Sequence, residues 1–334
     1  MRSNVCITAV IPTYNPNINH LATGLRSVLM QKGVDELEII VVDDSTDNRV
    51  SRLLDTTEFS QIYLIDGPRE GVGAARSLGY NLAKHDLIAH MDGDDICHPL
   101  RFFLQAAVIH SGIDLCGTNT CYFGDKRGWQ TFIESDAAIR FSLAFGAFIS
   151  QPSVMVNRRA LKDDGLFSAL DICEDYESWC RQAAKGYRFC NLRKRLLRYR
   201  VHGTQATAKK KDRIAEVSAD TRLKYIDEAG YGSRFREFFV AHNQDRWSLM
   251  TNSEINEFWH ISLEEGLQWG VHPQDLLRIF YAVFGRSPAL SPRLLATTLY
   301  APRLNNLWLD FEIQLKSKLS IMRKIKLDDL GRRA

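Results

Sequence analysis

Short apolar runs rich in β-branched residues alternate with amphipathic segments over the first 115 residues. Each run is too short for a buried helix and continuous enough for a strand that is covered on both faces. The predicted strands are Val5–Ile11, Leu37–Val42, Gln61–Ile65 and Leu87–Met91. Between them, apolar residues recur at helical spacing in the stretches 17–31, 47–55, 73–84 and 99–110. This alternation predicts a Rossmann-like α/β fold, with a mostly parallel sheet and helices on both of its faces.

The pattern changes twice further along the chain. From about 115 to 205 it loosens, and it predicts strands at Gly117–Phe123 and Tyr187–Val201 and helices at Asp136–Phe148 and Glu174–Lys185. After about residue 209 it is helical to the end. We therefore expect an α/β part that reaches residue 208, divided near 115, and a C-terminal α-helical region over 209–334.

Composition narrows the class of protein. Apolar residues make up 45% of the 334 residues and charged residues 25%, which excludes a disordered, collagenous or coiled-coil protein. The longest nearly apolar stretch, Phe141–Ile149, is far shorter than the 18 or so residues that span a membrane, so we expect no membrane span. No apolar run of signal-peptide length precedes the first prolines. The seven cysteines are scattered and lack a C-x-x-C pair, which indicates reduced thiols and a cytoplasmic location.

The net charge of +3 conceals an asymmetry along the chain. Residues 1–110 carry 9 basic and 14 acidic side chains, whereas the remainder carries 34 basic and 26 acidic ones. An acidic N-terminal part joined to a basic C-terminal part is typical of a metal-binding part followed by a part that faces anions or a membrane. It is also typical of an uneven distribution of surface charges without a function.

Three of the predicted strands end in polar clusters. In open parallel sheets, ligands bind beyond the carboxyl ends of the strands, so we expect these clusters to form one site. Three carboxylates within four residues repel one another, and Mg²⁺ or Mn²⁺ relieves this repulsion and brings substrate phosphates with it. The alternatives are a helix N-cap for the second cluster and a solvated acidic turn for the third. The clusters are Pro12-Thr13-Tyr14-Asn15, Asp43-Asp44-Ser45-Thr46-Asp47 and Asp92-Gly93-Asp94-Asp95.

Further candidates lie away from these strand ends. Gly71–Arg76 opens a helix, but it lacks the third glycine of a dinucleotide fingerprint and does not follow the first strand, so we exclude NAD and favour a diphosphate. Glu174 and Asp175 begin an amphipathic helix, where they either complement its dipole or supply a general base. His202 ends a strand, and its imidazole is either structural or a metal ligand.

With these residues in place, the sequence resembles the family 2 glycosyltransferases, which have the GT-A nucleotide-sugar fold. The resemblance spans roughly residues 5–207, and its pieces occur in the order of the family. They are AVIPTYN (9–15), IIVVDDSTDN (39–48), GVGAARSLGYNLAKHDLIAHMDGDD (71–95), SQPSVMVNRRAL (150–161), CEDYESWCR (173–181) and YRVHGTQAT (199–207). It implies a catalytic domain over 1–208, with a nucleotide-binding part over 1–115 and an acceptor-binding part over 116–208.

The resemblance also implies a role for each matched residue. Asp94 of the D-x-D motif is the principal ligand of Mn²⁺ or Mg²⁺, and His202 completes the metal site. Asp175 is the catalytic base, while Asp95, Glu174 and Gln151 lie beside the donor sugar or the acceptor. For Gln151 and Pro152, a plain turn before a strand at Ser153–Val156 is the alternative. The implied nucleotide-binding residues are Pro12, Thr13, Tyr14, Asp43, Asp44, Arg76 and Asp92.

The implied activity is an inverting, metal-dependent transfer of a sugar from a nucleotide-sugar, with UDP favoured over dTDP or GDP, to a glycan or lipid-linked acceptor in surface polysaccharide biosynthesis. Two alternatives stay open: a sugar nucleotidyltransferase, which needs a glycine-rich loop that PTYNPN lacks, and a non-catalytic nucleotide-sugar-binding protein. The sugar and the acceptor are not encoded in any motif we can interpret.

Two basic segments lie outside these roles. Residues 313–334 carry seven Lys or Arg against two Asp beside an apolar stripe, a pattern typical of peripheral contact with the cytoplasmic face of a membrane. It is equally typical of packing on the chain's own domain or on a second copy in a homo-oligomer. Arg193–Arg200 lacks the interleaved aromatics of a nucleic-acid surface, so we expect no nucleic acid and favour phosphate neighbours or a solvated strand edge.

Overall fold

The structure, a computed structural model, describes residues 4–161, 166–168, 170, 172–203, 211–242 and 250–284. Its centre is a nine-stranded sheet in the order β3-β2-β1-β4-β8-β6-β9-β5, with β7 paired to β6. The strands β1 to β4 are parallel to one another, and β8, β5 and β7 add antiparallel pairs in the second half. The strands are β1 (Cys6–Thr13), β2 (Glu36–Asp43), β3 (Tyr63–Asp66), β4 (Leu87–His90), β5 (Ile96–Cys97), β6 (Leu115–Gly124), β7 (Gly128–Gln130), β8 (Met155–Asn157) and β9 (Phe189–Val201).

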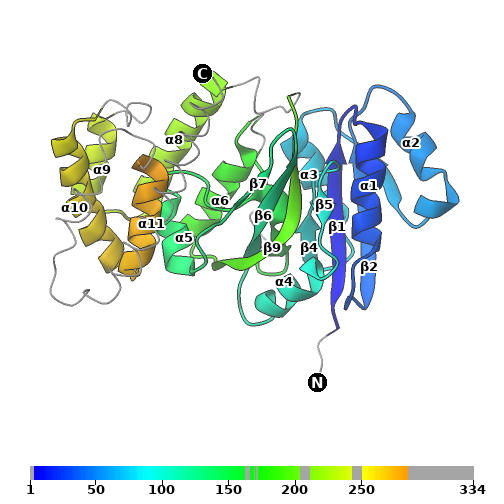
Figure 1. Ribbon diagram of the computed structural model, residues 1–334, viewed down its shortest axis with the longest axis horizontal. Coiled ribbons are helices and arrows are strands. Elements are labelled where there is room, and N and C mark those ends of the chain that lie inside the picture. Colours follow the sequence, from blue (N-terminus) through cyan, green and yellow to red (C-terminus); the bar gives the residue numbers. More distant parts are fainter. Residues whose placement is uncertain are drawn as a thin grey trace, which may run out of the picture.

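Helices cover both faces of this sheet, because its inner strands send apolar side chains to both sides (Figure 1). In β1, Ile7, Ala9 and Ile11 pack with α1, α2 and α4, whereas Val10 points to the core on the side of α3. The helices of this α/β part are α1 (Ile18–Leu29), α2 (Arg49–Leu54), α3 (Val72–Leu82), α4 (Arg101–Ile109), α5 (Asp136–Ser142) and α6 (Glu174–Ala184), with short 3₁₀ turns at Thr57–Phe59 and Gln151–Ser153.

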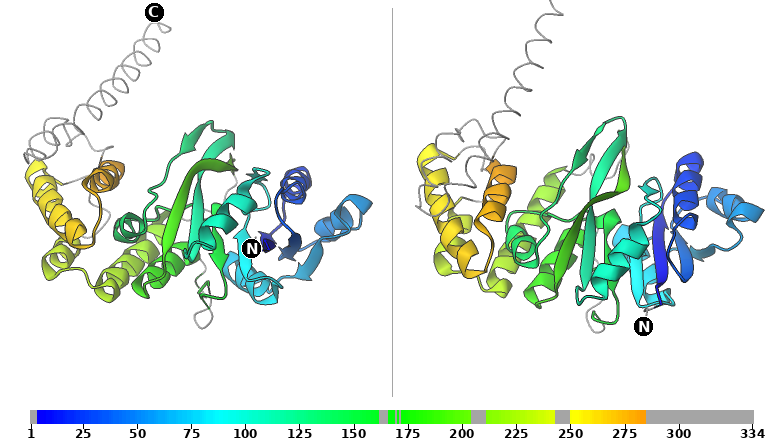
Figure 2. Two further views of the ribbon diagram at one scale, coloured as in Figure 1. Left: turned by 90° about the horizontal axis from the view of Figure 1, so that it is seen from below. Right: turned by 60° about the horizontal axis from the view of Figure 1, so that its bottom comes forward.

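The described part of the C-terminal region is helical and packs against α5 and α6. Figures 1 and 2 show these helices gathered at the end of the molecule opposite α1 and α2. Phe141 and Phe145 stack among aromatic rings from this region, and the Tyr231 hydroxyl donates to the Phe141 carbonyl at 2.9 Å. The region and the α/β part therefore share one apolar core. The helices are α8 (Lys211–Ala229), α9 (Ser233–Ala241), α10 (Asn252–Gln268) and α11 (Pro273–Phe284).

The predicted α/β class with a mostly parallel sheet is confirmed, and the main differences are local. The helix expected over Asp136–Phe148 ends at Ser142, and Gly146 has a φ of +152° that favours glycine. The short strands β5 and β7 were not predicted, because two or three residues carry no period that a sequence reveals. Gln151 and Pro152 form a 3₁₀ turn ahead of β8.

No helix within the described ranges is long and apolar enough to cross a membrane. The basic segment 313–334 and the last residues of the YRVHGTQAT motif lie outside the described residues.

Candidate active site

The three polar clusters meet at one edge of the sheet, as the parallel pattern predicted. Thr13 at the end of β1 pairs in register with Asp43 at the end of β2, and β4 runs parallel to β1 on its other side. The Thr13 carbonyl accepts from the Asp44 amide at 2.9 Å, so the two strand ends stay joined beyond the sheet. Pro12 and Thr13 are partly buried, while Tyr14 is 67% exposed. An exposed tyrosine ring beside two acids leaves a surface on which a base can stack.

Asp43 and Asp44 organise the loops around them rather than cap a helix. The Asp43 carboxylate accepts from the Ser45 amide at 3.0 Å, and the Asp44 carboxylate accepts from the Arg69 amide at 2.8 Å. A side chain at Gly67 would place its Cβ 2.0 Å from the Asp44 carboxylate, so the loop after β3 closes over Asp44 only because glycine stands there. Neither Asp43 nor Asp44 caps α2, which begins at Arg49 with Asn48 as its capping position, but the Asp47 carboxylate of the same cluster accepts from the Arg49 amide at 3.0 Å.

The D-x-D loop after β4 holds three carboxylates in three different environments. Asp92 forms an ion pair with Arg76 at 3.0 Å, and Asp94 lies 2.9 Å from His202 Nε2. Asp95 is fully buried and accepts from the Arg200 amide at 2.8 Å, while its second oxygen has no hydrogen-bond partner among the described residues. The loop lies against α1, where a Cβ at Gly24 would be 2.6 Å from the Gly93 carbonyl oxygen.

Electrostatics distinguish the carboxylates that follow Asp92. Burial raises the pKa of Asp94, the Asp92 carboxylate raises it further, and His202 opposes both effects. Burial raises the pKa of Asp95 well above its ordinary value, and Asp92 and Asp94 add to this shift. A divalent cation beside Asp94 would relieve this repulsion. The carboxylate suits Mn²⁺ or Mg²⁺, and an added imidazole ligand fits Mn²⁺ better than Mg²⁺, which prefers oxygen ligands.

Arg76 connects this loop to the predicted base. Its guanidinium is buried, where it donates to Asp92 on one side and to Glu174 on the other, and it lies 5.7 Å from the centre of the Phe167 ring. Burial alone would lower the pKa of Arg76, but the carboxylates of Asp92, Glu174 and Asp175 together raise it. The resemblance places Arg76 near the nucleotide, and in this structure its guanidinium binds two of the chain's own acids.

Glu174 and Asp175 begin α6 directly after Cys173, whose φ of +58° turns the chain into the helix. Burial raises the pKa of Glu174 although Arg76 opposes the shift. Burial also raises the pKa of Asp175, again against Arg76. Glu174 is tied to Arg76 by an ion pair, whereas the described contact of the Asp175 carboxylate is with the adjacent Tyr176 amide at 2.7 Å. Asp175 is thus the acid of the pair with the freer carboxylate.

Gln151 contacts His90, which lies among buried aromatic rings near Arg76. Its amide nitrogen is 3.2 Å from His90 Nδ1, and its buried oxygen has no partner within the described part of the chain. The His90 ring lies against Phe167 and Trp179. Burial and the nearby Arg76 and Arg101 hold the pKa of His90 well below its ordinary value, so the ring stays neutral.

Sequence reasoning missed three polar residues at the site. His90 ends an apolar strand two residues before Asp92, a position that could have singled it out. Arg101 is fully buried and donates to the carbonyls of His90 and Val154, although in the sequence it resembles any first-turn residue of a helix. The third, His20 on α1, is influenced by the charges of the D-x-D loop and β9. Burial lowers the pKa of His20, the Arg200 charge lowers it further, and the Asp94 carboxylate raises it.

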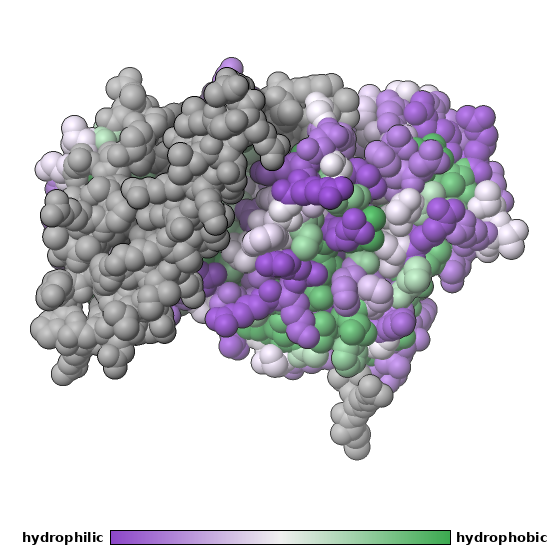
Figure 3. Space-filling model, in the orientation of Figure 1, coloured by the Kyte–Doolittle hydropathy of each residue, from purple (hydrophilic) through white to green (hydrophobic). Residues whose placement is uncertain are grey.

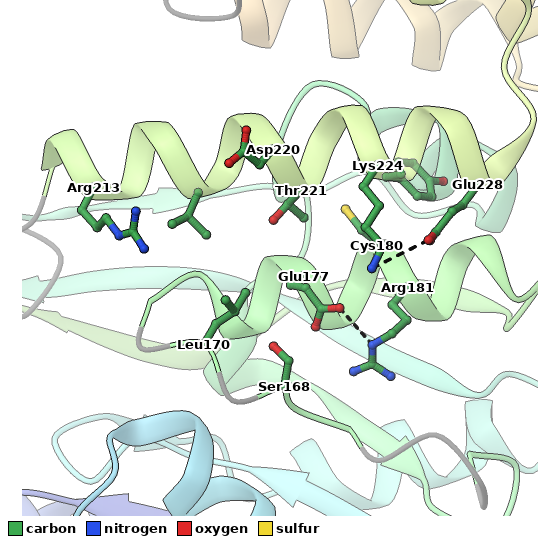
Figure 4. Close-up of a pocket in the computed structure, with 12 residues that line it drawn as sticks. Ser168, Leu170, Glu177, Cys180, Arg181, Arg213, Asp220, Thr221, Lys224 and Glu228 are labelled. Carbon is green, nitrogen blue, oxygen red and sulfur yellow. Dashed lines mark hydrogen bonds and ion pairs between the residues drawn. The ribbon is translucent and has the colours of Figure 1, made fainter.

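A cavity of about 410 Å³ lies between α6 and α8, and Figure 4 shows charged side chains lining it. An ion pair lies on each of the two helices that line the cavity: Glu177–Arg181 at 3.0 Å on α6, and Lys224–Glu228 at 3.8 Å on α8. None of the predicted site residues lines it, so it is separate from the strand-end site.

The sheet and its strand-end acids define a GT-A fold, the class of fold that binds nucleotide-sugars. Solved structures agree on the fold. The match to S. aureus TarS 1–349 in complex with UDP-GlcNAc covers 83% of this chain and 87% of that one, with a TM-score of 0.57 and 17% identity. The match to the mannosyltransferase PcManGT from Pyrobaculum calidifontis in complex with GDP-Man and Mn²⁺ covers 89% of this chain and 84% of that one, with a TM-score of 0.52 and 18% identity.

Sequence comparison agrees with this fold. Residues 8–164, just under half of the chain, match the model for glycosyl transferase family 2, and the matching relatives include glycosyltransferases. An uncharacterized glycosyltransferase of Methanocaldococcus jannaschii is 28% identical over 207 residues, which are 58% of this chain and 70% of that protein. The amylovoran biosynthesis glycosyltransferase AmsE of Erwinia amylovora is 25% identical over 202 residues, 58% and 76% of the two chains. The resemblance in the sequence is thereby confirmed.

Proposed function

We propose that the chain is an inverting, metal-dependent glycosyltransferase that moves a sugar from a UDP-sugar to a glycan or lipid-linked acceptor of surface polysaccharide. One observation carries this proposal: the buried guanidinium of Arg76 donates both to Asp92 of the D-x-D loop and to Glu174 beside Asp175. This network supports a base at Asp175 close to a donor site at the D-x-D loop. The UDP-GlcNAc in the TarS complex supports a uridine donor, and the amylovoran relative supports a polysaccharide product.

The chemistry follows from where the charges lie. Asp175 takes the proton of the acceptor hydroxyl as its oxygen bonds to the anomeric carbon. The bond from that carbon to the diphosphate oxygen breaks, and UDP leaves with the electron pair. One displacement from the face opposite the diphosphate inverts the anomeric centre. Because burial raises the pKa of Asp175, its carboxylate holds a proton more strongly than an exposed aspartate does.

Asp94 and His202 would hold the metal ion, as their 2.9 Å approach and the charge at Asp94 support. When bound, Mn²⁺ or Mg²⁺ neutralises charge on the leaving diphosphate. The Mn²⁺ in the PcManGT complex supports the use of a metal. Within the chain, Arg200 steadies the loop by donating from Nε to the Asp94 carbonyl at 2.8 Å.

Asp175→Asn tests the base. We expect hydrolysis of a UDP-sugar to UDP to fall by about 10²–10⁴-fold, because the isosteric amide cannot accept the proton. Binding of UDP with Mn²⁺, measured by isothermal titration calorimetry, should stay unchanged. The matched control is Glu177→Gln, at the acid that follows Asp175 on α6 and forms an ion pair with Arg181. Normal turnover by Asp175→Asn would refute its role.

Asp94→Ala tests the metal site. We expect Mn²⁺ to raise the Tm of the wild-type protein with UDP present, and Asp94→Ala to lose this shift because the main carboxylate ligand is gone. Asp114→Ala, at an acid remote from the D-x-D loop, should retain it. Undiminished donor hydrolysis by the wild type in EDTA would contradict the metal claim. Pyrophosphate release from UTP, without UDP release from a UDP-sugar, would favour a nucleotidyltransferase instead.

A further inference from the structure

A ribbon of β6, β7 and β9 carries arginines and aromatic rings on one face. Cys121 pairs in register with Trp129 on one side and Arg198 on the other, Phe123 pairs with Arg200, and Arg195 pairs with Asn119. Because paired residues point to the same side of a sheet, the aromatic and arginine side chains share a face. We call this set the basic aromatic face: Phe123, Trp129, Arg195, Arg198 and Arg200.

We propose that the basic aromatic face binds the acceptor, and that this acceptor is a glycan that carries negative charges, either carboxylates or phosphates. This inference rests on the proposed function, since it names the substrate class of that reaction.

The guanidinium groups lie over the rings. Arg195 is 4.6 Å from the centre of the Trp129 ring, while Arg198 and Arg200 lie 4.7 Å and 4.3 Å from that of Phe123. The Trp129 side chain is 63% exposed, and together with Phe123 and the arginines it forms part of a group rather than a single exposed residue. A guanidinium beside a ring can also donate N–H groups to an anion, and Arg200 already donates from Nε to the Asp94 carbonyl. Exposed ring area offers a surface for the C–H face of a sugar.

The charge around the face is predominantly positive. Four further cations flank it, at Lys126, Arg127, Arg193 and Lys194. The acids nearby are Asp125 in the turn, Glu134, which pairs with Arg193 at 3.1 Å, and Asp94 and Asp95 at the Arg200 end of the face. Figure 3 shows strongly hydrophilic side chains in the middle of the view, where Figure 1 places these strands. A hollow of about 490 Å³ opens here, lined by Tyr122, Phe123, Gly124, Arg127 and Arg198.

The face is continuous with the catalytic site through β9. Arg200 donates from its amide to Asp95 and from Nε to the Asp94 carbonyl, both at 2.8 Å, and the metal-site candidate His202 follows two residues later. A chain lying along the face therefore leads to the donor site. This continuity favours an acceptor over a nucleic acid or a lipid surface, which would have no reason to end at the D-x-D loop. Stacking rings also suit sugars better than lipid head groups.

The test measures polysaccharide binding by the full chain and by the double variant Trp129→Ala/Arg195→Gln. The probes are polygalacturonate as a carboxylated glycan and dextran as a neutral one, each followed by affinity electrophoresis. We expect polygalacturonate to bind at least about ten-fold more tightly than dextran, and the double variant to lose about ten-fold, which one cation–π pair and one charge contact can supply. The matched control, Tyr63→Ala/Arg52→Gln, removes an equally exposed ring and one charge from β3 and α2.

The readouts separate this inference from the proposed function. Binding of UDP with Mn²⁺ should be the same in the wild type, the double variant and Arg195→Gln alone, which also shows that the variants fold. Equal polygalacturonate binding by wild type and double variant would overturn the inference while donor hydrolysis stands. Tighter binding to a poly-dT oligonucleotide or to phosphatidylglycerol vesicles than to polygalacturonate would overturn it too. Absence of donor hydrolysis, with polygalacturonate still bound, would refute the proposed function instead.

Discussion

Arg76 is the residue on which the site's geometry depends most. In the sequence it follows a glycine turn and is typical of an anion ligand, and nothing there reveals that its partners are Asp92 and Glu174, 16 and 98 residues away. Burial of an ion pair is decided by tertiary packing, which no local pattern encodes. The types and positions of the acids could be predicted from the sequence, but their pairing could not.

Removing Arg76 should therefore destabilise the fold as well as the site. We expect Arg76→Met to lower the free energy of unfolding by about 3–5 kcal/mol, because it leaves the buried Glu174 carboxylate and the partly buried Asp92 carboxylate without their countercharge. Urea denaturation measures this. The control is Arg26→Met, whose pair with Glu58 is exposed and should matter far less. An equal, small effect in both variants would show that the Arg76 network is not structural.

Among the elements, the N-terminus of α6 joins stability to chemistry. The sequence pattern predicted this helix and its two leading acids, and the structure adds that Glu174 is held by Arg76 while Trp179 packs on His90. The order of helices and strands could be predicted from the sequence, because apolar residues recur at a different spacing in each. The short strands β5 and β7 could not be predicted, because two or three residues show no period.

The same element predicts how activity depends on pH. Asp175 must be ionised to accept a proton, so kcat/KM should fall as the pH is lowered through the pKa of Asp175. Because burial raises that pKa, the fall should begin above the ordinary aspartate value of 3.8. A pH profile of donor hydrolysis checks this, with circular dichroism at each pH to show that the protein stays folded. A rate that stays constant down to the ordinary value would contradict a buried base.

At the scale of the whole molecule, the sheet has two halves with different pairing. The parallel half was predictable from alternating strands and helices, whereas the mixed half brings β9 beside β6 across 74 residues and so creates the basic aromatic face. The helices α8 to α11 were expected as a region, but their aromatic contacts with Phe141 and Phe145 depend on which surfaces meet. Long-range pairing of this kind has no signature within a single segment.

The central claim is a single inverting displacement of UDP at this site. It is tested most directly by ¹H NMR of donor hydrolysis, using the UDP-α-sugar that with Mn²⁺ gives the largest thermal stabilisation. Attack from the face opposite the diphosphate predicts that the β-anomer of the free sugar appears first, before mutarotation mixes the two forms, and that Asp175→Asn forms it far more slowly. Initial release of the α-anomer would contradict the account.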